Sequence, residues 1–231
     1  MPQSNTMKIP PNPTHWIRNR TFPLFIGLIL LIALSPFFVG LEGVETNLFP
    51  VITLAAPLLG LLSFGTWKRA LPLAIAFIVL VPVSYALYGF DQTLIARSPL
   101  AFVAVLYYSY AIFALAGLLL RDTALMDDRV YGGMSIYILA ALMFSGIHRH
   151  ISAVDPAAYS NGLTNQPHAL LWNHALYFSL STITTVGYGD IVPRSNWARA
   201  MSNLEAVIGV AITIVFIARL ASLPRPSQQH H

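Results

Sequence analysis

The sequence predicts an all-α integral membrane protein with six membrane-spanning helices and one short re-entrant helix between the last two. The chain of 231 residues is 56% hydrophobic and only 10% charged. Soluble domains carry about a quarter charged residues, so this composition indicates a chain embedded in a membrane. Near the carboxyl end, an apolar run too short to cross a bilayer is followed by a full-length one, which is typical of a helix that enters the bilayer without crossing it.

Six other apolar runs come close to the ~20 residues that a helix needs to cross a bilayer. The second of them is short and contains two prolines. The first follows a polar, basic segment and is too long for the apolar core of a signal peptide, so we expect it to be retained. The expected spans are Phe22–Val39, Leu48–Phe64, Ala70–Tyr88, Leu100–Leu120, Val130–Phe144 and Ala200–Ala221.

Lysine and arginine residues indicate the orientation, because they are enriched in the cytoplasmic flanks of membrane helices. With both termini inside, nine basic residues lie on the cytoplasmic side and four lie outside. We therefore expect cytoplasmic termini and a place in the cell membrane, and we ascribe the net charge of +4 to this orientation, not to nucleic-acid binding. The inner set is Lys8, Arg18, Arg20, Lys68, Arg69, Arg121, Arg129, Arg219 and Arg225, and the outer set is Arg97, Arg149, Arg194 and Arg199.

The short apolar run, Trp172–Ile183, has room for about three helical turns. The segment 184–190 that follows reads Thr-Thr-Val-Gly-Tyr-Gly-Asp. Because Gly187 and Gly189 have no Cβ, they accept positive φ without strain. The backbone can then alternate between right- and left-handed conformations, which ordinary L-residues resist. Such an alternation directs successive carbonyl oxygens toward one axis, where they can replace the water shell of a cation.

A Thr-Val-Gly-Tyr-Gly segment between a short and a long apolar helix resembles the two-helix pore domain of the potassium channel superfamily. The resemblance covers roughly Val130 to Ala221 and implies a re-entrant pore helix, a selectivity filter and passive conduction of K⁺. One chain supplies one strand of a fourfold filter, so the implied assembly is a homotetramer. The implied filter is Thr185, Val186, Gly187, Tyr188 and Gly189, with K⁺ bound by the carbonyls of Thr185, Val186, Gly187 and Tyr188.

The helices before the pore domain lack the residues of a voltage sensor. Voltage sensing needs arginines that move through the membrane field, each worth about 2.3 kcal/mol per 100 mV. The fourth expected span contains no basic residue, and Arg97 and Arg121 lie outside it. We therefore expect a voltage-insensitive channel whose first four helices form a scaffold or sense another stimulus. The expected divisions are a cytoplasmic segment 1–21, a four-helix transmembrane region 22–129, the pore domain 130–221 and a short cytoplasmic tail 222–231.

The resemblance also implies side chains that support the filter. Asp190 lies at the outer mouth, where relatives tie this aspartate to a pore-helix side chain, and Tyr177 can offer its hydroxyl. The alternative for Asp190 is a solvated carboxylate that raises the local cation concentration. Ser181 stands where some relatives carry an acidic residue, so this second support departs from the family pattern. Thr184 ends the pore helix, whose dipole directs its negative end toward the cavity below the filter.

The last span carries four further candidates. Glu205 is its only acidic residue, and the cost of burying a carboxylate in lipid predicts contact with the pore helix or filter backbone. A cavity-lining charge and a place near the outer interface are the alternatives. Gly209 resembles the hinge of an inner helix, with tight packing as the alternative. Thr213 is expected to line the cavity, with Ile217 below it toward a hydrophobic gate.

Four of the seven histidines lie in or beside the expected loop from Gly146 to Pro167. Histidine titrates near neutral pH, so external proton sensing and metal block are conceivable roles for them. Their spacing matches no specific metal site, and ordinary polar loop residues are the favoured interpretation. The four are His148, His150, His168 and His174.

The sequence contains no nucleotide motif, catalytic dyad or metal-ligand cluster, which argues against an enzyme and predicts no cofactor beyond K⁺ as the permeant ion. Cysteine is absent, so disulfides are excluded. The expected partners are further copies of the chain and membrane lipid, without nucleic acid or a small-molecule substrate. A non-conducting or regulatory pore-like protein and a cation transporter subunit are the alternatives. The intact filter motif argues against both.

Overall fold

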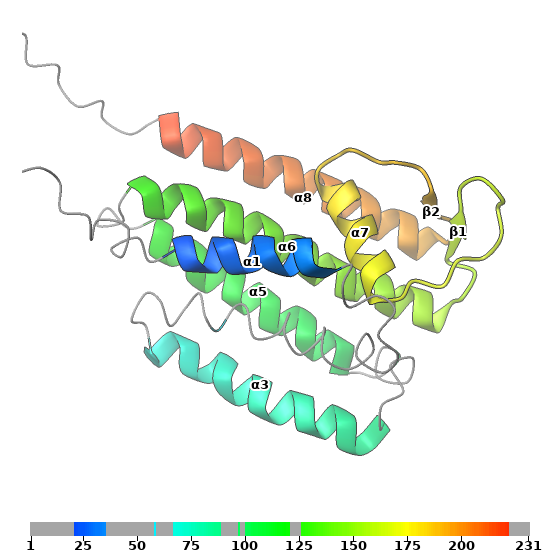
Figure 1. The fold of residues 1–231 in the computed structure, drawn as a ribbon, viewed down its shortest axis with the longest axis horizontal. Helices are drawn as coiled ribbons and strands as arrows, with labels where there is room; N and C mark the ends of the chain where they lie inside the picture. Colours follow the sequence, from blue (N-terminus) through cyan, green and yellow to red (C-terminus); the bar gives the residue numbers. More distant parts are fainter. Residues whose placement is uncertain are drawn as a thin grey trace, which may run out of the picture.

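The computed structural model describes residues 21–35, 58, 67–88, 97, 100–120 and 126–221. The helices run side by side, and α7 lies with two short strands at one end of the bundle (Figure 1). The expected terminal segments, apart from Thr21, and the second expected span, apart from Leu58, lie outside the described residues. The elements are α1 (Phe22–Leu34), α3 (Trp67–Tyr88), α5 (Leu100–Leu119), α6 (Met126–Val154), β1 (Tyr159–Asn161), α7 (Trp172–Ile183), β2 (Ile191–Pro193) and α8 (Asn196–Ala221).

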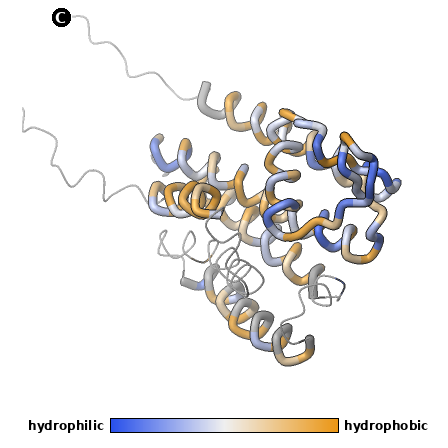
Figure 2. Tube along the Cα trace, turned by 45° about the vertical axis from the view of Figure 1, so that its right-hand side comes forward, coloured by the Kyte–Doolittle hydropathy of each residue, from blue (hydrophilic) through white to orange (hydrophobic). Residues whose placement is uncertain are grey.

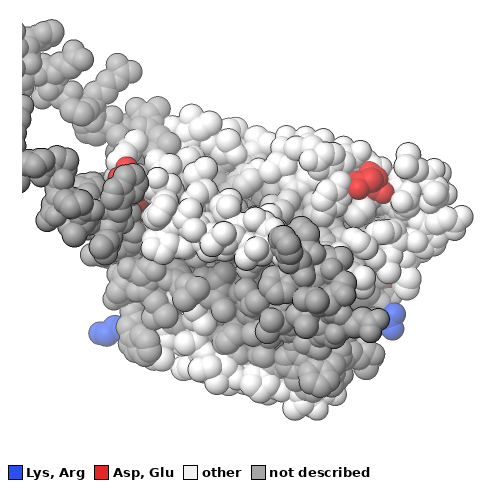
Figure 3. Space-filling view, in the orientation of Figure 1, with Lys and Arg blue, Asp and Glu red and all other residues white. Residues whose placement is uncertain are grey.

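Three of the described helices are long and apolar enough to cross a membrane: α5, α6 and α8. Helix α1 is apolar but has only 13 described residues, and α3 has 22. Hydrophilic residues gather at the end that holds β1 and β2 (Figure 2). On the face in Figure 3, charged side chains appear only toward the two ends of the molecule. The helical membrane fold is confirmed with three candidate spans, and the total of six stays a prediction.

Helix α6 is much longer than expected. The prediction ended this span at Phe144 and began a loop at Gly146, but the helix continues to Val154. The loop prediction was wrong because the polar residues after Phe144 were taken as exposed. Several of them are instead buried at helical spacing, and the buried polar residues in these turns are Ser145, His148, Arg149 and Ser152.

Helix α7 has the expected bounds and packs against both α6 and α8. The Tyr137 hydroxyl of α6 donates to the carbonyl of Ile183, the last residue of α7, at 2.5 Å. On the other side, a Cβ at Gly209 of α8 would overlap the same carbonyl oxygen and lie 2.7 Å from Cγ1 of Ile183. Close packing of α8 on the end of α7 therefore explains this glycine, and its role as a hinge stays a prediction.

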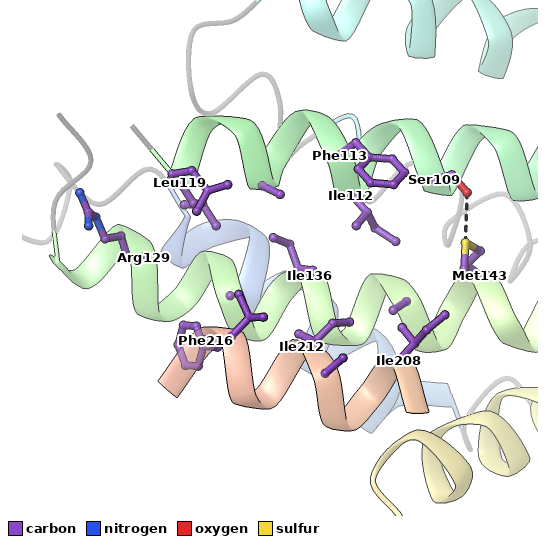
Figure 4. A pocket seen from close by; sticks show the side chains of 16 residues that line it. Ser109, Ile112, Phe113, Leu119, Arg129, Ile136, Met143, Ile208, Ile212 and Phe216 are labelled. Atoms are coloured by element: carbon purple, nitrogen blue, oxygen red, sulfur yellow. Dashed lines mark hydrogen bonds between the residues drawn. The ribbon is translucent and has the colours of Figure 1, made fainter. Parts of the chain in front are cut away.

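An apolar cavity of about 490 Å³ separates α8 from α5 on one side of α6 (Figure 4). Phe113 of α5 and Ile212 of α8 line it, and Arg129 lies at one end. Helix α8 instead contacts α6, where a Cβ at Gly133 would overlap the ring of Phe216. The second half of α8 is therefore held by α6 through a helix contact that only a small residue permits.

Strands β1 and β2 form a small antiparallel pair on either side of the segment 184–190 in sequence. Asn161 pairs with Ile191, and Tyr159 pairs with Pro193. Because β2 begins directly after Asp190, this pairing fixes where the chain leaves the segment. The loop between α6 and α7 is therefore part of the framework around it.

Candidate ion-binding segment and its supports

The backbone of the segment 184–190 alternates in handedness. Positive φ occurs at Thr185 (60°), Gly187 (58°) and Gly189 (80°). The sequence predicted this for the two glycines, and the structure extends it to Thr185. A left-handed conformation costs an ordinary L-residue roughly 1–2 kcal/mol, so neighbouring interactions must stabilise it at Thr185.

Main-chain hydrogen bonds to the end of α7 hold this backbone. The Thr185 amide donates to the Thr182 carbonyl at 2.9 Å. The carbonyl of Ser181 accepts from the amides of Val186 (2.9 Å) and Gly187 (3.1 Å). The first half of the segment thus turns its N–H groups toward α7, which offsets the cost of the strained conformation.

The carbonyl groups of the segment are left available. Among the described residues, no group donates a hydrogen bond to the carbonyls of 185–188. Every residue of 184–190 is exposed on the surface of the chain. Carbonyl oxygens without an internal partner are suitable ligands for a hard cation such as K⁺.

Tyr177 supports the outer end of the segment from α7. Its ring stacks on that of Tyr188, with centroids 5.5 Å apart and planes 10° apart. The Tyr177 hydroxyl donates a hydrogen bond to the Asp190 carboxylate. Asp190 also accepts from the Ile191 amide at 3.0 Å, so its carboxylate is held in place at the mouth.

Gly162, which follows β1, packs directly on the outer end of the segment. Its amide donates to the Asp190 carbonyl at 2.8 Å. A Cβ at this position would overlap the carbonyl oxygen of Gly189 and lie 2.9 Å from its carbonyl carbon. The sequence analysis missed this contact, for which a glycine in a polar loop was the only available signal.

Comparison with known proteins agrees with this geometry. A family model described as "Ion channel" matches residues 134–225, which cover most of α6 together with α7, the segment 184–190 and α8. Residues 134–225 are thus similar to the pore region of the potassium channel superfamily. By this likeness we call α6 the outer helix, α7 the pore helix and α8 the inner helix.

The similar curated proteins are potassium channels that match this chain over short stretches. Potassium channel subfamily K member 17 of Homo sapiens is 35% identical over 78 residues, which are 32% of this chain and 24% of that protein. The calcium-gated potassium channel TvoK of Thermoplasma volcanium is 40% identical over 48 residues, which are 21% of this chain and 14% of that protein. The chain thus spans about a quarter or less of these relatives. No solved structure matches it.

Two predicted supports on the pore helix use their hydroxyl groups within their own helix. The Ser181 hydroxyl donates to Phe178 of its own helix at 2.9 Å, and only its carbonyl holds the segment. The Thr184 hydroxyl likewise donates to the Leu180 carbonyl at 2.6 Å. No hydrogen bond links either side chain to Asp190 in the described structure, so Tyr177 is the side chain from the pore helix that reaches this carboxylate.

Glu205 of the inner helix is completely buried in the pore domain. Its carboxyl group contacts Ser179 of the pore helix, in agreement with the predicted contact with that helix. It also contacts His148 of the outer helix. The burial excludes the two alternatives, a cavity-lining charge and an exposed interfacial site. Thr213 donates to the Gly209 carbonyl at 2.9 Å, while Ile217 is exposed on the chain. The cavity roles of these two stay predictions.

The four outer histidines do not form one group. The interpretation of His148 as a polar loop residue was wrong, because it is buried on α6. His150 lies two positions further on the same helix, edge-on to the ring of Phe102. His168 and His174 lie near each other, with ring centroids 4.8 Å apart. Among the described residues, no cluster of three or more His, Asp or Glu side chains could hold a metal.

Replacing Tyr177 by phenylalanine tests the contact with Asp190. The variant keeps the ring stack on Tyr188 but loses a hydrogen bond to a charged group, which contributes about 1.5–3 kcal/mol. We expect discrimination between rubidium and sodium in liposome uptake to weaken about tenfold or more, with the oligomeric state unchanged by size. The same substitution at Tyr110 of α5 serves as the control. If Tyr177→Phe weakens selectivity equally in an Asp190→Asn background, the two side chains do not act together.

Proposed function

We propose that the chain is one subunit of a homotetrameric, potassium-selective channel that conducts K⁺ passively. Thr185, Val186, Gly187 and Tyr188 bind the ion through their backbone carbonyls, and Gly189 completes the filter. The alternation of positive φ along 185–189, beside carbonyls without an internal partner, is the observation that carries this proposal. The likeness to potassium channels supports the choice of ion.

Electrostatics around the filter favour cations at both ends. The pore helix ends at Ile183, and its carbonyl end carries the negative pole of the helix dipole. The Asp190 carboxylate lies at the other end, beside the filter's outer mouth. Both features attract cations and repel anions, while the carbonyl ligands replace the water shell of K⁺.

Exposed apolar surface on α8 supports assembly with other copies. A helix that met only water would not expose so many large apolar side chains. In the proposed tetramer they meet neighbouring subunits, lipid and a central cavity lined by Thr213, with Ile217 toward a gate and Gly209 as the hinge. The exposed large apolar residues described on this helix are Trp197, Leu204, Val207, Val210, Ile214, Val215 and Ile217.

We further infer that this channel does not sense voltage through α5. That helix, Leu100–Leu119, contains no arginine or lysine, so little charge would move through the membrane field with it. Helices α1, α3 and α5 then serve as a scaffold for the pore domain. Six spans per subunit, cytoplasmic termini and a place in the plasma membrane complete the proposal.

Rubidium uptake into liposomes tests this function. Purified protein in vesicles loaded with KCl should accumulate radioactive rubidium driven by the potassium gradient. Vesicles loaded with NaCl have no potassium gradient and should not accumulate rubidium in this way. Uptake no greater than that of empty vesicles, from protein that is tetrameric by size, would favour the non-conducting alternative.

A further inference from the structure

A continuous chain of buried polar groups joins four elements behind the filter. His148 of α6 lies 2.7 Å from the Tyr159 hydroxyl through Nδ1 and 2.8 Å from Glu205 Oε2 through Nε2. The other carboxyl oxygen of Glu205 meets the Ser179 hydroxyl of α7, which lies 2.6 Å from the Ala141 carbonyl. The side chains of Tyr159, His148, Glu205 and Ser179 have no exposed surface.

The hydrogen-bond partners of His148 indicate which of its ring nitrogens carries a proton. The described structure gives the Tyr159 hydroxyl one acceptor, Nδ1 of His148, so this nitrogen carries no proton and the ring proton lies on Nε2. That proton is donated to Glu205. A doubly protonated ring would leave the tyrosine proton without an acceptor, which is costly for a buried group. The hydrogen-bond pattern therefore favours the Nε2–H tautomer, with Nδ1 as the acceptor.

Aromatic packing holds the imidazole in this orientation. The ring of Phe178 meets it edge-on, with centroids 4.9 Å apart and planes 88° apart. The Tyr159 ring lies at 90° to it, at 5.9 Å. Aromatic contacts on two sides and hydrogen bonds at both nitrogens hold the imidazole in one place within the network.

Both ends of the network lead to the filter. At one end, Tyr159 begins β1, which pairs with β2 directly after Asp190 and continues into Gly162 on the carbonyl of Gly189. At the other end, Ser179 lies on the pore helix two positions before Ser181, whose carbonyl holds the amides of Val186 and Gly187. One imidazole thus links the framework of the outer mouth to the base of the filter.

We propose that His148 is a positioning residue for the filter. In its neutral form it connects Tyr159 of the outer loop to Glu205 of the inner helix, and so sets the outer strand at a fixed distance from the pore helix. This inference rests on the proposed channel function for its effect on selectivity. Its effect on local structure does not depend on conduction.

Two variants remove the same hydrogen bond from opposite sides. In His148→Gln the amide nitrogen reaches the position of Nε2 and still donates to Glu205, but Nδ1 is lost. Tyr159→Phe removes only the hydroxyl and keeps the buried ring, so it remains informative if His148→Gln does not fold. The matched control is His150→Gln, on the same helix but facing α5.

We expect each variant to lower the uptake ratio of rubidium to sodium about five- to tenfold, the effect of one lost buried hydrogen bond. Hydrogen–deuterium exchange should speed up in peptides covering 159–162 and 186–193. Combining the two substitutions should add little, because they break one bond. His150→Gln should change neither measurement.

The outcomes separate this inference from the proposed function. A selective wild type whose selectivity and local exchange are unchanged by both variants overturns the role of His148. A wild type that does not distinguish rubidium from sodium overturns the proposed function instead. In that case faster exchange confined to 159–162 and 186–193 still supports the link through His148, and exchange equal to wild type refutes it.

Discussion

Replacing Gly187 by alanine is expected to abolish selective conduction and leave the tetramer assembled. At a φ of 58°, an L-residue is destabilised by roughly 1–2 kcal/mol, and the cost recurs in each proposed subunit. The backbone relieves it by rotating the peptide, which turns a carbonyl away from the axis. Helix packing is unaffected, because an added Cβ meets no atom within 4 Å.

Uptake of rubidium and sodium into liposomes measures this effect, with size-exclusion chromatography to follow the tetramer. We expect discrimination to fall by about tenfold or more, since 1.4 kcal/mol corresponds to a factor of ten. Gly117→Ala in α5 is the matched control, because its Cβ is also free of contacts but its backbone is helical. Unchanged selectivity in Gly187→Ala would rule out this segment as the filter.

Replacing Gly162 by alanine is expected to disrupt the outer mouth from outside the filter itself. The added Cβ would overlap the Gly189 carbonyl oxygen, and this backbone cannot yield without moving the filter. The amide bond from Gly162 to the Asp190 carbonyl would break with it. Overpacking of this kind costs about 1–3 kcal/mol, and here the strain falls on the ion-binding backbone.

We expect rubidium flux to fall by about tenfold or more in Gly162→Ala, and potassium to protect the protein less against heating. Leu163→Ala is the control, because this neighbour in the same loop is 90% exposed. Wild-type flux in Gly162→Ala would mean that the loop moves independently of the filter. The contact would then have no part in holding the mouth.

The sequence predicted the parts of this fold that depend on local pattern. The bounds of α7 were right, because an apolar run of limited length is bracketed by polar segments. Positive φ at Gly187 and Gly189 followed from their missing side chains. The predicted end of α6 was wrong because polar residues such as His148 are typical of loops, and their buried partners are distant in sequence.

The supports of the filter depended on contacts that no local pattern reveals. His148 and Glu205 are 57 positions apart, so neither predicts the other. Resemblance to the family pointed to Tyr177 and the structure places it at Asp190, whereas Ser181 acts through its main chain. A glycine in a polar loop was too weak a signal to identify Gly162, because its importance comes from the backbone of Gly189 beside it.

The reversal potential of the purified channel in a planar bilayer tests the central claim most directly. With equal concentrations of KCl on one side and NaCl on the other, the proposed filter predicts a large reversal potential with the KCl side negative, whose size is set by the permeability ratio of K⁺ to Na⁺. Gly117→Ala should give the same value and Gly187→Ala should not. A reversal potential near zero for the wild-type protein would mean equal permeability to both ions and would contradict a potassium-selective filter at Thr185 to Gly189.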